Sequence, residues 1–273
     1  MIRRCLDKDP SRRLRDIGDA RFDLDGSPQG PEESSFEPGG RGTDQRFTFE
    51  PTYNAAPVWT PDGGRLTFFS IRDGRWSLWE EAAAGTGVET ALLSGSHDLV
   101  PNDWSPDGAH LLFTELAVDT TGADIWVMTR AQGAGKEPQR KPFVRTPADE
   151  NFARFSPDGR WVVYSSNQSG RYEVYVRPFP ASDPGPGGML ISTGGGIEPT
   201  WPSGGKEIFY VGADNMLMAV DVKAGVTLEA GVPRPLFRTA PARVIRYDAG
   251  PADSGFWSRL GPTRRSQRRS PYC

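Results

Sequence analysis

Short runs rich in apolar residues and bounded by polar ones recur along this chain, and each run follows an aromatic residue and a tight turn. The pattern is clearest in "FSPDGRWVVYSS", residues 155–166, where Phe155 precedes a Ser-Pro-Asp-Gly turn and a segment rich in Val and Tyr. β-Branched and aromatic residues bounded by turn residues are typical of strands. The segment is therefore predicted to hold two strands joined by a tight turn.

Four copies of this unit occur in order along the chain. They are "VWTPDGGRLTFFS" from Val58, "DWSPDGAHLLFTE" from Asp103, "RFSPDGRWVVYSS" from Arg154 and the weaker "TWPSGGKEIFYVG" from Thr200. Their aromatic residues Trp59, Trp104, Phe155 and Trp201 are 45, 51 and 46 residues apart. A period of about 40 to 50 residues with several short strands in each copy is the signature of propeller blades.

Each copy continues with further strand-like segments in the same order. The second strand is expected at 65–70, 110–115, 160–166 and 206–212, and the third at 76–81, 124–130, 172–179 and 216–222. A fourth strand is expected at 89–94, 141–146 and 233–239, and less clearly at 187–193. The pattern predicts an all-β chain, a β-propeller of about four four-stranded blades plus a truncated fifth, with a short N-terminal helix.

The repeated turn residues have a structural explanation and a functional alternative. Pro presets φ in the turn, Asp tolerates the next position, and Gly takes a positive φ that ends a hairpin loop. Alternatively, the repeated carboxylates of Asp62, Asp107 and Asp158 bind calcium or act as catalytic acids. The aromatic residue before each turn packs between blades or stacks on a ligand. Turn Asp residues beside Gly ordinarily cap the backbone, which favours the structural interpretation.

Composition narrows the class of protein without naming a function. The 273 residues include 32 Lys and Arg against 35 Asp and Glu, so a net charge of −3 gives no reason to expect nucleic acid as a partner. Cys5 and Cys273 supply neither a disulfide framework nor metal-ligand spacing. No apolar run approaches the roughly 20 residues of a membrane span, and no signal peptide is evident. The chain as encoded is expected to be cytoplasmic.

These repeats resemble the TolB-like, WD-repeat-like β-propellers of bacteria, whose blades carry the same aromatic-Ser-Pro-Asp-Gly sequence. The resemblance spans about residues 46–240. The segments "GADIWVM", "RTPADENFARFSPDGRWVVYSSNQSGRYEVYVRPFP" and "ISTGGGIEPTW" look like the propeller that follows a serine/threonine kinase domain in many bacterial receptor-type kinases. The first 21 residues resemble the end of a kinase C-lobe, since Asp9, Pro10 and Arg13 match the family's Asp-Pro-x-x-Arg. The resemblance implies a sensor module.

The segments outside the repeats are expected to lack the catalytic core of a kinase. Residues 1–22 are predicted to be a remnant helix of the C-lobe, and residues 23–45 a flexible linker where membrane-anchored relatives have a transmembrane helix. Residues 241–273 are expected to hold a truncated blade and a disordered basic tail. The glycine-rich loop, the phosphate-anchoring Lys, the His-Arg-Asp loop and the Asp-Phe-Gly site are all absent from the sequence, so it cannot transfer phosphate.

Other catalytic classes are disfavoured in the same way. Propellers also accompany α/β-hydrolase domains in prolyl oligopeptidase-type enzymes, but the chain has no Gly-x-Ser-x-Gly elbow. His97 and His110 are the only histidines, so a three-His zinc site cannot form and a Ser-His-Asp set is unconvincing. We therefore expect a non-catalytic binding module that needs no cofactor or metal. A propeller related to the prolyl oligopeptidases and a non-functional gene fragment remain as alternatives.

Any binding surface is expected on the segments that lead into each blade. Repeat architecture brings these segments to one face, so Asn54, Asp98, Glu150 and Glu198 are predicted to form a polar, mostly acidic ring near the channel mouth. Clustered carboxylates favour the binding of a cationic peptide, a metal ion or a polar small molecule. A protein partner with exposed cationic side chains would bind in the same way. The alternative is that these groups only cap turns or face water.

Overall fold

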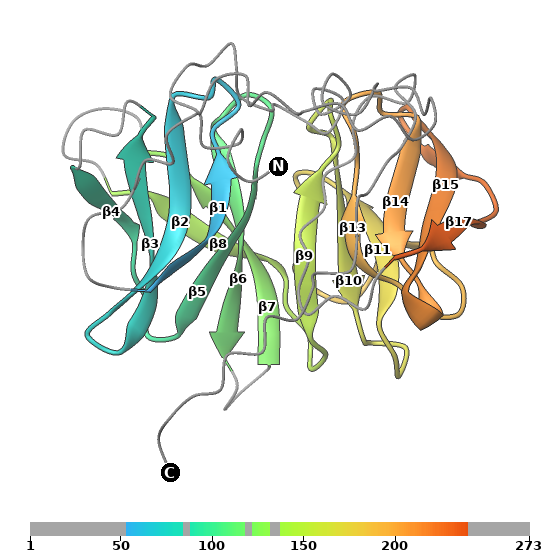
Figure 1. Cartoon of the computed structure of the whole chain (residues 1–273), viewed down its shortest axis with the longest axis horizontal. Helices are drawn as coiled ribbons and strands as arrows, with labels where there is room; N and C mark the ends of the chain where they lie inside the picture. Colours follow the sequence, from blue (N-terminus) through green and yellow to red (C-terminus); the bar gives the residue numbers. More distant parts are fainter. Residues whose placement is uncertain (1–52, 84–87, 118–121, 132–136, 240–273) are drawn as a thin grey trace, which may run out of the picture.

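The computed structural model describes residues 53–83, 88–117, 122–131 and 137–239. These residues form four antiparallel sheets that follow one another along the chain, and the described part contains a single short helical turn, η2 (Ala213–Asn215) (Figure 1). In the first three sheets successive strands pair as a meander, and the fourth sheet adds a last strand that pairs out of this order. The predicted all-β propeller fold is confirmed.

The first three sheets have four strands each. The first contains β1 (Asn54–Trp59), β2 (Arg65–Arg72), β3 (Arg75–Ala82) and β4 (Glu89–Leu93). The second contains β5 (Asp98–Trp104), β6 (His110–Ala117), β7 (Gly122–Thr129) and β8 (Gln139–Val144). The third contains β9 (Glu150–Phe155), β10 (Trp161–Ser166), β11 (Glu173–Pro178) and β12 (Met189–Leu190). The weak fourth-strand pattern before residue 193 thus corresponds to a strand of only two residues.

The fourth sheet has an additional short strand at its outer edge. It contains β13 (Ile197–Thr200), β14 (Glu207–Val211), β15 (Met216–Ala224), β16 (Leu228–Ala230) and β17 (Arg234–Arg238). β15 is nine residues long, so its first half pairs with β17 while its second half pairs with β16. The segment after residue 223 therefore completes the fourth blade.

The four sheets pack as consecutive blades. The first strand of each sheet contacts the first strand of the next, which places β1, β5, β9 and β13 innermost around a common axis. In Figure 1 the arrows of β1 and β9 run in the same direction, so equivalent ends of the blades lie at the same end of the molecule. We call the end where these inner strands begin the strand-start face and the opposite end, where the Pro-Asp-Gly turns lie, the turn face.

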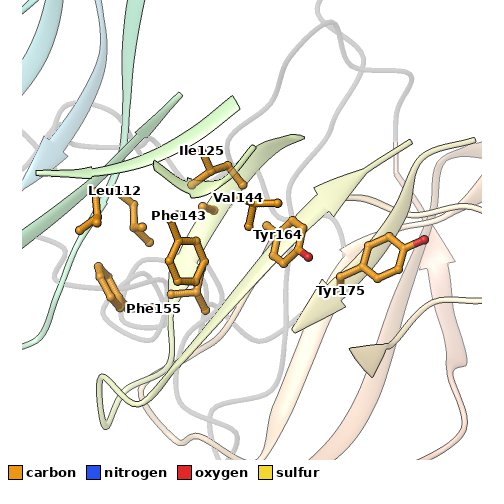
Figure 2. Close-up of a cluster of buried hydrophobic side chains, with 10 residues drawn as sticks. Leu112, Ile125, Phe143, Val144, Phe155, Tyr164 and Tyr175 are labelled. Atoms are coloured by element: carbon orange, nitrogen blue, oxygen red, sulfur yellow. The ribbon is translucent and has the colours of Figure 1, made fainter. Parts of the chain in front are cut away.

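Alternation along the strands supplies a separate apolar core to each blade interface. Figure 2 shows the cluster between the second and third blades, where Leu112, Ile125 and Phe143 meet Phe155 and Tyr164. These side chains are buried because each strand presents alternate residues to opposite faces, and both faces of a middle blade are covered by neighbours. The aromatic residues Trp104, Phe155 and Trp201 are buried in such clusters, as the packing interpretation predicts.

The repeated turns have the hydrogen bonds of backbone caps. The Ser105 hydroxyl donates to Asp107 Oδ1 at 2.5 Å and the Ala109 amide donates to the same oxygen at 3.0 Å, and both bonds lower the pKa of Asp107. Asp62 and Asp158 accept the equivalent pairs of bonds. The carboxylates close their own turns, so the structural interpretation of these residues is confirmed.

The turns of successive blades also contact one another. Gly108, Gly159 and Gly205 have φ of 69°, 70° and 67°, values that favour glycine. A Cβ at Gly159 would lie 3.4 Å from Pro106 Cδ, and the equivalent positions at Gly108 and Gly205 lie 3.8 Å from the proline of the preceding turn. The Pro-Asp-Gly turns thus join neighbouring blades as well as neighbouring strands.

Several expectations concern residues outside the described ranges. They are the C-lobe helix at 1–22, the linker at 23–45, and the truncated blade and basic tail at 241–273.

Candidate binding face

The four residues predicted to form a ring all lie at the strand-start face. Asn54, Asp98 and Glu150 are the first residues of β1, β5 and β9, and Glu198 is the second residue of β13. Counted back from the aromatic residue of each blade, however, Asn54 and Glu150 are five residues away, Asp98 is six and Glu198 is three. The blades therefore bring them to the same end of the molecule at different positions in the repeat.

Asp98 has a structural role between two blades. Its Oδ1 accepts the Trp76 amide hydrogen of β3 at 3.0 Å, which ties the first blade to the start of the second. Asp149, six residues before Phe155, is its counterpart, because Asp149 Oδ1 accepts the Ala123 amide hydrogen of β7 at 3.0 Å. The sequence alignment selected Glu150 and missed Asp149, although counting from the aromatic residue would have found it.

Glu150 is completely buried. The Thr146 hydroxyl donates to its Oε1 at 2.5 Å, and the Ser166 hydroxyl donates to the same oxygen at 3.3 Å. Burial raises the pKa of Glu150 to about 7, and the Asp124 charge adds to this effect. Because its side chain is enclosed, Glu150 cannot contact a ligand at the surface as the protein stands.

Glu198 lies in a bulge that recurs in the inner strands. Ala56, Phe152 and Glu198 each stand three residues before the blade aromatic and have φ of 53°, 58° and 51°. At each of these places the inner strand has one extra residue, so that two of its residues lie opposite one residue of the neighbouring strand. The second blade has Pro101 here, whose ring keeps φ negative. Nothing in the residue types Ala, Phe and Glu indicates such a conformation, so the sequence could not predict it.

The exposed polar residues of the strand-start face include both signs of charge. Asn54, Asp98 and Glu198 are partly exposed, and the tips of the β2–β3 and β14–β15 hairpins expose Asp73 and Asp214. Arg75, Arg171 and Arg238 are exposed beside these hairpin ends. The face is therefore polar with mixed charges, less uniformly acidic than the sequence suggested.

An amide and a phenol meet on this face in the third blade. Asn151 Nδ2 lies 3.5 Å from the Tyr172 hydroxyl oxygen, and both side chains are half-buried. Burial, and then the Asp149 charge, raise the pKa of Tyr172, which keeps its hydroxyl protonated. Neutral amide and phenol groups of this kind bind ligands by hydrogen bonds and by ring contact.

The histidines are engaged in ordinary contacts. His97 Nδ1 lies 3.8 Å from Glu115 Oε1, and His110 Nδ1 lies 3.1 Å from the Thr129 hydroxyl, with its ring against Phe179. Among the residues that the structure describes, no three His, Cys, Asp or Glu side chains are grouped as metal ligands. Within the same residues, no helix is long and apolar enough to cross a membrane.

Comparison with known proteins identifies the architecture. The crystal structure of TolB from Acinetobacter baumannii superposes with a TM-score of 0.52 at 22% identity over 69% of this chain and 44% of that chain. This chain has a TolB-like β-propeller fold. The Tol-Pal system protein TolB of Bordetella pertussis is 28% identical over 129 residues, which is 47% of this chain and 28% of that protein. No family model matches the chain.

A peptidase also shares sequence with this TolB-like propeller. The uncharacterized peptidase YuxL of Bacillus subtilis is 26% identical over 155 residues, which is 44% of this chain and 24% of that protein. The matched regions cover about a quarter of these curated relatives. The propeller is thus similar to parts of proteins that differ in name and length. This similarity supports the assignment of the fold and does not assign a function.

Proposed function

We propose that this chain is a non-catalytic β-propeller module that binds a protein, a peptide or a small polar ligand at its strand-start face. The observation that supports this most directly is that each inner strand begins at this face, so short polar segments from all four blades are presented together on packed sheets. Loops held by a rigid scaffold are where binding residues are most often found.

A cationic segment fits the carboxylates of this face. Asp73, Asp214 and Glu198 are at least partly exposed, and their charges attract Lys or Arg side chains during association. Arg75 and Arg171 nearby would orient the partner by repelling like charge. Asn151 and Tyr172 add uncharged hydrogen-bonding groups. A peptide with spaced positive charges and polar residues is therefore the partner class we favour.

Binding of a short, fluorescently labelled Lys-rich peptide to the whole chain tests this proposal. Glu198→Lys should weaken binding by about fivefold at low salt, because it replaces an attractive contact with a repulsive one. Glu229→Lys is the matched control, since Glu229 is an exposed acid that pairs with Lys223 at the turn face. Equal affinities of both variants and the parent protein, measured by fluorescence anisotropy, would rule out this face.

The proposal extends to the larger protein in which such a propeller module functions. The resemblance of residues 1–21 to the end of a kinase C-lobe supports a sensor module that accompanies a bacterial serine/threonine kinase. The relatives named above are TolB proteins and a peptidase, so the kinase association rests on residues 1–21 and on the propeller segments that resemble those of receptor-type kinases. The sequence of the reading frames on both sides of the gene distinguishes a kinase-associated module from a gene fragment.

A second candidate is the propeller segment of a peptidase, which the match to YuxL favours. Peptidases of the α/β-hydrolase type carry their nucleophilic Ser in a Gly-x-Ser-x-Gly elbow, and this sequence contains no such motif. Hydrolysis by this chain would therefore need a different nucleophile. A screen of the purified chain against ester and peptide substrates separates the two candidates. Hydrolysis that a single Ser→Ala change abolishes would replace the binding-module proposal with the enzymatic one.

A further inference from the structure

Two acidic side chains from neighbouring blades are buried at one interface. Glu150 begins β9 in the third blade, and Asp124 is the third residue of β7 in the second. Their relative exposures are 0% and 1%, and the Asp124 charge acts directly on Glu150. Two carboxylates in a water-poor interface repel each other strongly unless one of them carries a proton.

The hydrogen bonds of Glu150 leave one of its oxygens without a partner. Both the Thr146 and the Ser166 hydroxyls donate to Oε1. Oε2 is buried and has no hydrogen-bond partner in the described part of the chain. No cation among the described residues forms an ion pair with Glu150, and burying an uncompensated charge is costly. The geometry therefore favours the neutral acid.

The positive charges near this pair act on carboxylates other than that of Glu150. Arg145 Nε is 3.7 Å from Asp124 Oδ2 and its side chain is 45% exposed. On β6, Glu115 stands opposite Asp124 and pairs with Arg140 at 3.2 Å. Neither arginine forms an ion pair with Glu150, so the acid on β9 depends on its own proton for neutrality.

Apart from Arg154 on β9 itself, which pairs with Asp103, the remaining ionisable groups around β9 that the structure describes are negative or neutral. Tyr164 on β10 and Tyr172 both sense the Glu150 charge, and burial raises the pKa of each phenol. β5 carries two acids with partners of their own, since Asp98 accepts the Trp76 amide hydrogen and Asp103 lies 3.8 Å from Arg154. The other acids on packed elements are Asp149 before β9 and Glu198 on β13.

We propose that Glu150 and Asp124 form a pH-sensitive joint between the second and third blades, which is tight while Glu150 is protonated and loosens when Glu150 becomes a second buried anion. The Thr146 and Ser166 hydroxyls hold one oxygen in place in both states. Loosening therefore acts first on the segment 145–150, which leads into β9 at the strand-start face.

The direction of the pH effect follows from the difference between the folded and unfolded protein. The pKa of Glu150 rises from 4.5 when unfolded to about 7 when folded, so the folded state holds the proton more strongly. This contribution to stability is complete below 4.5, is lost as the pH rises towards 7, and is absent above that. The melting temperature should therefore fall between about pH 4.5 and about pH 7.

Thermal unfolding of the full chain across this pH range tests the joint. Glu150→Gln is neutral at every pH, so its melting temperature should fall less than that of the parent protein. Asp124→Asn should also reduce the fall, because it removes the neighbouring charge. Glu173→Gln is the matched control: Glu173 is equally buried, but its Ser192, Gly194, Gly195 and Arg171 donors lower its pKa. This control should melt at lower temperature with an unchanged pH dependence.

Amide hydrogen exchange locates the effect. Protection of the Ala123 and Asn167 amides, which bond to Asp149 beside the joint, should drop between about pH 6 and about pH 8 after correction for intrinsic rates, relative to amides of β14 and β15. Parallel melting curves for the parent, Glu150→Gln and Asp124→Asn would overturn the proposal. If Glu150→Gln does not fold, Asp124→Asn and the exchange data decide it, and uniform loss of protection across all blades would also overturn it.

Discussion

Single glycines at the blade joints fix where neighbouring carboxylates can lie. Gly122 has φ of +93°, and a Cβ there would stand 2.5 Å from Asp149 Oδ1. That oxygen accepts the Ala123 amide hydrogen, so the missing side chain at one residue allows the hydrogen bond at the next. Gly74 in the β2–β3 hairpin has a similar φ of +74°, with no atom within 4 Å of such a Cβ.

Substituting these two glycines distinguishes the energetic cost of backbone strain from that of a steric clash. Gly74→Ala should cost about 1 kcal/mol of unfolding free energy, because only the positive φ is unfavourable. Gly122→Ala should cost roughly 2 to 3 kcal/mol, because it also displaces Asp149 and leaves an amide without its acceptor. Urea denaturation measures both. Equal losses in the two variants would mean that the contact with Asp149 contributes nothing.

At the scale of strands, an arginine joins the first two blades. Arg130, immediately after β7, donates to both carboxylate oxygens of Glu80 on β3, at 2.7 Å and 3.2 Å, and its guanidinium lies 4.3 Å from the ring centroid of Trp104. Glu80 is buried, and Arg65 of its own blade donates to it as well. A planar cation that pairs in bidentate fashion and stacks on an aromatic ring orients the two elements that it connects.

Removing this contact should destabilise the blade interface more than removing an exposed pair. Arg130→Gln should cost about 1 to 2 kcal/mol, because Arg65 still partly neutralises the buried Glu80. Lys223→Gln, which removes an ion pair exposed at both ends, should change stability by less than about 0.5 kcal/mol. Chemical denaturation of the two variants provides the comparison. An equally small effect of both changes would show that Arg130 only covers Trp104.

At the scale of the whole molecule, the described blades form a series with two ends. The first and fourth sheets share no strand pairing, and each sheet pairs only within itself. The outermost strands are short, from two residues in β12 to six in β8, and Met189 and Leu190 of β12 are exposed. Strand edges with unpaired backbone groups offer sites for pairing with other chains.

We therefore expect the purified chain to associate as its concentration rises. Sedimentation velocity over a range of concentrations should show species larger than the monomer, and added salt should not dissolve them, because backbone pairing and apolar contact resist screening. A single monomeric species that is stable at high concentration would contradict this expectation.

The architecture of the blades follows from local patterns in the sequence. The continuous apolar run within "RWVVYSS" indicates a strand with two buried faces, and the Pro-Asp-Gly turn before it needs only local backbone chemistry. Because both signals act over a few residues, their four copies were sufficient to predict four blades, their strand order and the burial of Trp104, Phe155 and Trp201. The resemblance to TolB-like propellers added the name of the fold.

The roles of the residues at the blade joints, in contrast, depend on contacts that form when the blades pack together. Asp98 and Glu150 look alike in sequence, but one caps a strand of the preceding blade while the other is enclosed with Thr146 and Ser166. The positive φ of Phe152 and the Pro106–Gly159 contact likewise depend on the strand or blade alongside. Burial, pKa and interblade hydrogen bonds are set by groups some 20 to 50 residues apart, as Ala123 and Asp149 or Glu80 and Arg130 illustrate, and no local pattern records those distances.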